Sequence, residues 1–202
     1  MISILTGDII NSRQAETAAW LDVLRKALHK VAPKHSEIFR GDSFQLQVKP
    51  EEAFIKAVYI KSCIKTFRYL DVRIAIGIGK KGYAAKKITE ANGEVFVFSG
   101  EKLEILKKEG INLAARTISP EFDKEMNLAI RLALVAMDNW TPASAAIIKL
   151  SIENNNPSQK DLAALAKKGQ SSVSEALKRA DFPLILEFDQ EYRRKVKELI
   201  KI

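Results

Sequence analysis

Residues 37–48 of the chain, EIFRGDSFQLQV, read as two short strands joined by a tight turn. Phe44, Leu46 and Val48 alternate with two glutamines, which is the pattern of a strand that buries only one of its faces. The glycine and aspartate between the two runs are a common hairpin signal. The stretch therefore predicts a β-hairpin.

The segments on either side of this hairpin predict a sheet with helical crossovers. Ile2–Ile10 is apolar and β-branched, and residues 15–31 repeat apolar side chains at a helical period. A hairpin between two helical crossovers is the split βαβ, or ferredoxin-like, pattern. We therefore predict an α+β fold in which a mixed sheet carries helices on one face. The predicted order is strand 2–10, helix 15–31, the hairpin, a helix from Pro50, strand 72–79, helix 93–108, strand 111–115 and helix 121–140.

The chain changes character after Trp140. Thr141 and Pro142 are typical of a helix start, because threonine caps a helix and proline is favoured in its first turn. Beyond them the spacing predicts helices, apart from a short apolar run at residues 184–186 that reads as a strand. We predict two domains, residues 1–138 and residues 139–202. The predicted helices of the second cover residues 142–154, 158–168 and 171–181, with a charged terminal helix from about Asp189.

Two short helices in this tail have the pattern of a helix-turn-helix. Small or apolar side chains stand where the helices would cross, and polar side chains point outward from the second helix. The turn departs from the usual pattern, because two lysines replace the usual glycine and apolar residue and Gly169 comes later. A plain pair of packed helices is the alternative. For binding to duplex DNA, the predicted contact residues are Lys167, Lys168, Gln170, Ser171, Ser172, Ser174, Lys178 and Arg179.

Two aspartates stand at predicted strand ends. Asp8 lies at the end of the first strand and Asp42 at the hairpin tip, and these strands are neighbours in a split βαβ sheet. Carboxylates at such positions suit Mg²⁺ or Mn²⁺ held together with nucleotide phosphates. Gly7, Asn11 and Gly41 are then the candidate nucleotide-binding residues. The alternative is that both aspartates are ordinary turn residues.

Three stretches resemble the catalytic core shared by class III nucleotide cyclases and GGDEF-type cyclases. They are the first strand with its Asp8-Ile9, the hairpin Gly41-Asp42, and RIAIGIG at residues 73–79. The resemblance implies that Asp8 and Asp42 are the metal ligands. Class III cyclases also carry an asparagine and an arginine that serve the ribose and the transition state. Phe98 and Lys102 stand near those two positions here. The resemblance therefore implies metal and nucleotide binding rather than cyclisation.

Over nearly its full length the chain resembles the SatD family of bacterial proteins. That resemblance implies a cyclase-like sheet domain followed by a DNA-binding helix-turn-helix, and it implies an architecture more than a reaction. The motifs that carry it are TGDIINS at residues 6–12, RGDSFQ at 40–45, RIAIGIG at 73–79, NGEVF at 92–96 and WT at 140–141.

Composition narrows the function classes. The 202 residues carry a formal net charge of +8, which favours a polyanionic partner. The single cysteine, Cys63, excludes an intramolecular disulfide and lies in an apolar helical stretch, so we predict that it is buried. Two histidines without partners at ligand spacing argue against a histidine metal site. Lysines also gather just after the glycine-rich strand end, at Lys80, Lys81, Lys86 and Lys87.

Together these patterns predict a bacterial transcriptional regulator that binds double-stranded DNA through its tail. The sheet domain is expected to bind an effector or to dimerise. Helix 121–140 and the amphipathic helix at residues 191–200 are each expected either to form a homodimer seam or join the domains, or to pack within the chain. The alternatives are a metal-dependent nucleotide cyclase or phosphotransferase, and a nucleotide-binding module whose tail contacts a protein. With no signal peptide and no run long enough to span a membrane, a cytoplasmic protein is expected.

Overall fold

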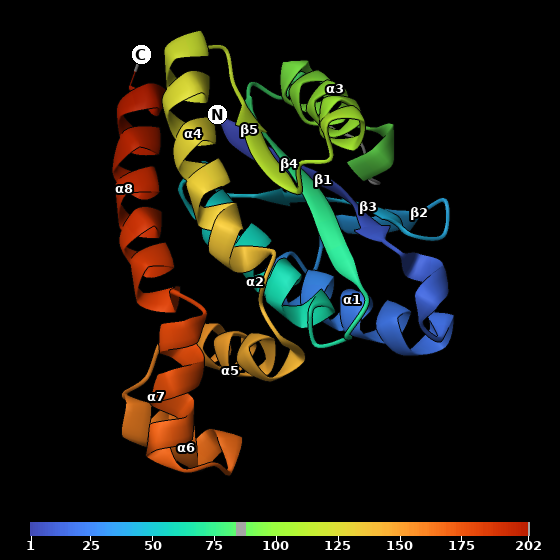
Figure 1. Ribbon diagram of the computed structural model, residues 1–202. Helices are drawn as coiled ribbons and strands as arrows, with labels where there is room; N and C mark the ends of the chain where they lie inside the picture. Colours follow the sequence, from blue (N-terminus) through green and yellow to red (C-terminus); the bar gives the residue numbers. More distant parts are fainter. Residues whose placement is uncertain (84–87, 202) are drawn as a thin grey trace.

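The computed structural model describes residues 1–83 and 88–201, which form a sheet with helices followed by a helical tail (Figure 1). The predicted order of strands and helices is confirmed up to α4 (Pro120–Met137). The elements are β1 (Ile2–Ile10), α1 (Thr17–Val31), β2 (Ser36–Phe39), β3 (Ser43–Val48), α2 (Ala53–Ile64), β4 (Asp71–Gly79), α3 (Glu94–Glu109), β5 (Leu113–Arg116), α4 (Pro120–Met137), α5 (Pro142–Glu153), α6 (Gln159–Ala166), α7 (Gln170–Arg179) and α8 (Phe182–Ile200), with 3₁₀ turns η1 (Ser12–Gln14), η2 (Pro50–Glu52) and η3 (Ile88–Glu90).

The five strands form one mixed sheet in the order β2-β3-β1-β4-β5. The neighbours among β2, β3, β1 and β4 are antiparallel, whereas β5 runs parallel to β4. The first four strands have the split βαβ arrangement that the sequence predicts, because β3 lies between β1 and β2, the two strands that α1 connects. The α+β fold class is therefore confirmed.

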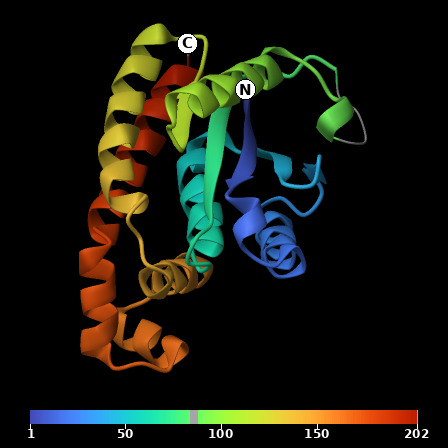
Figure 2. The ribbon, with the colours of Figure 1, turned by 45° about the vertical axis from the view of Figure 1, so that its right-hand side comes forward.

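Helices cover both faces of the sheet, so the prediction of helices on one face is wrong. Leu5, Ile74 and Ile76 point into the large core beneath α1, α2 and α4. The alternate side chains face α3, where Ala75 and Ala114 meet Leu103 and Leu106 in a second cluster. Figure 2 shows α3 lying on its own side of the sheet. The central strands therefore bury both of their faces, which is why the β4 sequence is an almost continuous apolar run.

A glycine lets α3 lie directly against the sheet. A side chain at Gly77 of β4 would place its Cβ 2.4 Å from the Val95 carbonyl oxygen and 2.8 Å from the Ser99 nitrogen. On the same face, the Thr6 hydroxyl donates to the Ser99 hydroxyl oxygen at 2.9 Å. The glycine-rich end of β4 thus serves close backbone packing.

Residues 184–186 lie inside α8, so the prediction of a strand there is wrong. Ile185 is buried whereas Leu184 is exposed, as a helical period requires and a three-residue window cannot reveal. The buried side of α8 continues through Tyr192, Val196 and Leu199. Helix α8 therefore begins at Phe182, seven residues before the predicted start.

The predicted boundary after residue 138 falls in the turn between α4 and α5. Across it the apolar core is continuous, since one cluster holds Ile130 of α4, Ile148 of α5 and Tyr192 of α8. Helix α8 runs back beside α4, while α5, α6 and α7 lie together at one end of the molecule (Figures 1 and 2). Cys63 is buried, as predicted.

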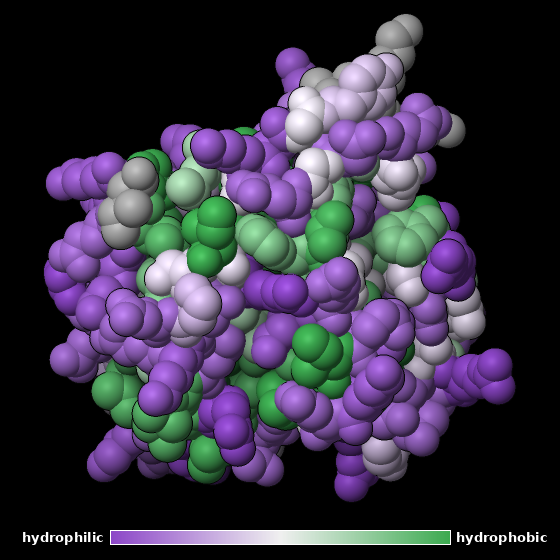
Figure 3. Space-filling model, turned by 90° about the horizontal axis from the view of Figure 1, so that it is seen from above, coloured by the Kyte–Doolittle hydropathy of each residue, from purple (hydrophilic) through white to green (hydrophobic). Residues whose placement is uncertain are grey.

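The surface is largely hydrophilic when viewed from the end at which α8 stops, with separate apolar patches between the charged side chains (Figure 3). Among the described residues, no helix combines the length and the apolar character needed to cross a membrane.

Candidate functional site

The tail helices α5, α6 and α7 pack against one another in a three-helix unit. Leu162 and Ala163 of α6 and Val173 and Leu177 of α7 are buried where the two helices meet, as predicted. Ile148 of α5 belongs to the same core. A helix supporting the two crossing helices is the arrangement of DNA-binding helix-turn-helix units.

The turn between α6 and α7 forms although it lacks the usual glycine. Lys167 ends α6 in the left-handed conformation with φ of 52°, which is where helices commonly place glycine. The N–H of Lys168 donates to the Ala163 carbonyl at 3.0 Å and closes the last turn. Ser158 caps the start of α6 by accepting from the Asp161 N–H at 3.2 Å. The turn therefore differs from the usual pattern in having lysine instead of glycine, while its backbone takes the left-handed conformation that glycine usually supplies.

The predicted DNA-contacting side chains lie around α7. Seven are exposed and Ser174 is half-buried. Since α7 buries Val173, Ala176 and Leu177, helical spacing places Ser171, Glu175 and Lys178 along the centre of its exposed face. We call these three residues the α7 crest.

Two hollows flank the α7 crest. One, of about 220 Å³, is lined by Lys168, Ser172 and Arg179 together with the start of α5. The other, of about 350 Å³, is lined by Ser174 and Lys178 together with Gln159 and the start of α8. The predicted contact residues thus divide between the two sides of one exposed helix.

Glu175 is a residue of this surface that the sequence prediction left out. It is exposed on the α7 crest, and its carboxylate lies 3.5 Å from the Arg179 guanidinium. A carboxylate there repels phosphates but can accept a hydrogen bond from cytosine in the major groove. The signal was present in the sequence, because Glu175 stands one helical turn from Ser171 and Arg179.

The left-handed conformation of Lys167 can be tested by measuring the stability of variants at the turn. We expect Lys167→Gly to raise the free energy of unfolding by about 0.5–1 kcal/mol, because glycine adopts the left-handed conformation without the Cβ clash. Lys168→Gly removes the same charge at a position without positive φ, so it should not stabilise the protein. Urea denaturation compares the two variants. A destabilised Lys167→Gly protein would contradict this account of the turn.

The two aspartates come together at one end of the sheet. Asp8 of β1 lies opposite Ser43 of β3, next to Asp42 in the hairpin loop. The Ile9 N–H donates to the Asp42 carbonyl oxygen at 3.1 Å, and the Ser12 hydroxyl donates to the Asp42 carboxylate at 3.1 Å. The predicted convergence of these strand ends is therefore present.

Two cations that the prediction did not include lie against Asp8. Arg73 faces Asp8 across the β1–β4 ladder with Nη1 3.2 Å from the carboxylate, and Lys107 of α3 approaches to 3.8 Å. Burial raises the pKa of Asp8, Arg73 and Lys107 lower it, and the nearby charge of Asp42 raises it, with a net upward shift. Lys107 also pairs with Glu104 at 2.8 Å, so Arg73 is the closer cation at Asp8, and a divalent ion would compete with both cations for this carboxylate.

Within the described residues there is no group of three or more histidine, cysteine, aspartate or glutamate side chains arranged to hold a metal ion. The donor set at this end of the sheet consists of two carboxylates and the Ser12 hydroxyl. This set fits a divalent ion only in part.

The three candidate nucleotide-binding residues have structural roles. Gly7 lies where its neighbours leave no space for a side chain. Asn11 has a φ of 60°, and its side-chain amide donates to the Tyr69 carbonyl at 3.2 Å. Gly41 has a φ of 88° and follows Arg40 at 52°, so the hairpin loop uses two left-handed residues in succession.

Gly7→Ala is expected to lower the free energy of unfolding by about 1–3 kcal/mol. The added methyl group would lie 2.5 Å from the Phe44 ring and 2.6 Å from the Arg73 carbonyl oxygen. Chemical denaturation measures the change. Gly100→Ala is the control, because a Cβ at this position in α3 meets nothing within 4 Å and alanine favours the helix. Equal stability of Gly7→Ala and the wild type would contradict the packing role.

The second lysine group is only partly described. Lys80 is exposed, and the Lys81 ammonium donates to the Gln47 side chain at 3.3 Å. Lys86 and Lys87 lie outside the described residues.

No protein-family model and no curated protein matches this chain.

Proposed function

We propose that this protein binds double-stranded DNA through α6 and α7 and acts as a transcriptional regulator. The observation that carries the proposal is the three-helix unit in which α7 buries one side on α5 and α6 and exposes the α7 crest. Lys178 on that crest, with Lys167 and Lys168 in the preceding turn, supplies charges suited to phosphates. Such a regulator would act in the cytoplasm of a bacterium, and membership of the SatD family stays a prediction.

Binding of genomic DNA fragments at several salt concentrations tests this proposal. We expect Lys178→Glu to weaken binding at least about tenfold and to reduce the slope of log affinity against log salt by about one. Lys108→Glu makes the same charge change on an exposed position of α3 and should affect binding little. Equal losses in the two variants, or no binding to any fragment at low salt, would contradict the proposal.

The DNA-binding form that we propose is a homodimer joined through α4. Leu128, Leu132 and Val135 are 62%, 68% and 70% exposed and follow one another at spacings of four and three residues. This is the spacing of a helix–helix seam, and we call these three residues the α4 stripe. Helix-turn-helix dimers read two half-sites about one DNA turn apart, so a second copy of the chain is the expected partner.

The surroundings of the α4 stripe fit a second copy. A hollow of about 310 Å³ beside it is lined by Leu132 and Val135 of α4 with Leu184 and Phe188 of α8. Leu184 is itself 64% exposed. A two-fold axis parallel to α4 would pair the stripes and leave both helix-turn-helix units at the same end, since α4 leads toward α5 there (Figure 1).

A nucleotide-binding site at Asp8 and Asp42 is the second candidate. It is favoured by the proximity of the two carboxylates and by the Arg73 Nε atom, which is buried without a hydrogen-bond partner in the part of the chain that the structure describes. Titration of Asp8 by NMR with and without Mg²⁺ and ATP tests it. A bound cation would lower the raised pKa of Asp8, whereas an unchanged titration curve would exclude the metal site.

A further inference from the structure

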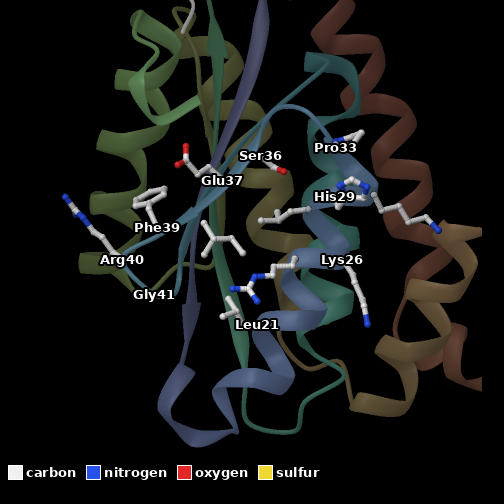
Figure 4. A pocket seen from close by; sticks show the side chains of 13 residues that line it. Leu21, Lys26, His29, Pro33, Ser36, Glu37, Phe39, Arg40 and Gly41 are labelled. Atoms are coloured by element: carbon white, nitrogen blue, oxygen red, sulfur yellow. The ribbon is translucent and has the colours of Figure 1, made fainter. Parts of the chain in front are cut away.

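An open groove runs between α1 and the edge strand β2, on a part of the molecule that the DNA-binding proposal does not use (Figure 4). Its volume is about 1150 Å³, and it is lined by Leu21, Arg25 and His29 from α1 and by Ser36 and Ile38 from β2. Leu21 and Ile38 are half-buried against the main core. The groove therefore has an apolar floor and a polar wall.

The backbone of β2 leaves hydrogen-bonding groups free along this groove. The Gln47 N–H donates to the His35 carbonyl at 2.9 Å, which makes His35 and Gln47 a hydrogen-bonded pair of the β2–β3 ladder. Hydrogen-bonded pairs alternate in an antiparallel ladder, so Glu37 and Phe39 bond to β3. The N–H and C=O groups of Ser36 and Ile38 point outward, and β2 is paired only with β3 among the described strands.

The wall of the groove is basic. Arg25 and His29 stand one helical turn apart on α1, and no side-chain hydrogen bond or ion pair joins either of them to the rest of the described chain. The acid in the lining, Glu37, points to the other face of β2, where its carboxylate accepts from the Thr89 hydroxyl at 2.6 Å. A ligand in the groove thus meets unpaired cationic and N–H donor groups with no facing carboxylate from the lining.

We propose that this groove binds an acidic, extended segment of a partner protein, which adds to the sheet as a strand beside β2. The alternating donors and acceptors of Ser36 and Ile38 match a peptide backbone, whereas a DNA backbone offers acceptors alone. The Arg25 guanidinium attracts acidic side chains, and the His29 ring offers a further N–H donor. Two copies paired through β2 would instead bring these basic walls together, so a second copy fits the groove poorly.

Binding of a fluorescent hexapeptide of alternating valine and glutamate to the full-length protein tests the proposal. A hexapeptide of alternating valine and lysine is the matched control. We expect the acidic peptide to bind at least about tenfold more tightly than the basic one, and more weakly as salt rises. Equal binding of the two peptides, or no binding of the acidic one at millimolar concentration, would overturn the proposal.

Hydrogen exchange locates the contact. The acidic peptide should slow exchange of the Ser36 and Ile38 amides, while those of Glu37 and Phe39 are already bonded to β3 and should change little. Duplex DNA that protected the same two outward amides would make the groove a nucleic acid surface and would also overturn the proposal.

Two pairs of variants measure separately how the charge of Arg25 and the backbone N–H of Ser36 contribute to peptide binding. Arg25→Glu should weaken peptide binding at least about tenfold, and Lys108→Glu on α3 should not. Ser36→Pro removes one outward N–H and leaves the β2–β3 ladder intact, because the first residue of an edge strand tolerates proline. It should weaken binding relative to Ser36→Ala, which keeps the N–H. Equal binding by the two Ser36 variants would rule out strand addition.

Discussion

Replacing Leu132 with glutamate is expected to convert the protein to a monomer and to lower its affinity for a two-site DNA fragment at least about hundredfold. Leu132 lies in the middle of the α4 stripe and is 68% exposed, so its replacement disturbs little of the core within one chain. In a dimer, the same change would bury two carboxylates against an apolar surface, which is strongly unfavourable.

Sedimentation and DNA binding measure the two parts of this prediction separately. Val97→Glu is the matched control, because Val97 is exposed on α3, away from both α4 and the helix-turn-helix. A Leu132→Glu protein that remains dimeric would show that the α4 stripe is not the interface. A wild-type monomer that binds DNA as tightly as the variant would refute the dimer and leave the α7 surface as the DNA-binding element.

The expected loss follows from linkage between the two half-sites. Once one helix-turn-helix of a dimer is bound, the second binds as an intramolecular event at a high effective concentration. A monomer keeps all the contacts of the α7 crest but loses this advantage. Its affinity for a single half-site should therefore stay close to that of the wild type, which distinguishes lost dimerisation from a damaged DNA surface.

Local patterns in the sequence were enough to predict the hairpin, the order of the elements up to α4, and the two short tail helices with a turn between them. The alternation that begins at Phe44 and the buried positions of Leu162 and Val173 are set by contacts close in sequence or by a simple period. The helix on the second face was also signalled, because Ile74-Ala75-Ile76 is apolar on both sides of its strand. The strand assigned to residues 184–186 failed because three apolar residues fit either period.

The composition of the candidate sites depended on long-range pairing that no local pattern encodes. Arg73 meets Asp8 because β1 and β4 pair in one particular register, 65 residues apart in sequence. Lys107 reaches the same carboxylate from α3. The outward groups of β2 likewise depend on which residues of the hairpin form hydrogen-bonded pairs. The cations beside Asp8 and the unpaired backbone groups of β2 could therefore be identified only from the three-dimensional structure.

A charge cluster around the buried Lys61 joins the sheet to the end of α4. Lys61 of α2 is 2% exposed, and its ammonium lies 2.6 Å from the carboxylates of both Asp71 and Asp138. Lys65 lies 3.3 Å from Asp71 and donates to the Asp138 carbonyl at 2.6 Å. Two lysines and two aspartates thus balance, and they hold the first residue of β4 against the residue that follows α4.

Lys61→Met is expected to lower the free energy of unfolding by about 1.5–3 kcal/mol, because it removes a buried ammonium from between two carboxylates, of which Asp138 is 37% exposed to water. Methionine matches the lysine stem in volume, so the loss measures charge rather than packing. Urea denaturation followed by circular dichroism gives the change. Lys26→Met is the control, because its pair with Asp22 is largely exposed and should contribute no more than about 1 kcal/mol.

The double variant Lys61→Met/Asp138→Asn separates an unpaired charge from a lost attraction. If the cost of Lys61→Met arises mainly from leaving Asp138 without its ammonium partner, neutralising that carboxylate should recover part of the stability. Asp71 keeps Lys65 and the Val72 N–H, which donates to it at 2.7 Å, so it needs no compensating change. A double variant that is less stable than Lys61→Met would show instead that Asp138 stabilises the end of α4 independently of Lys61.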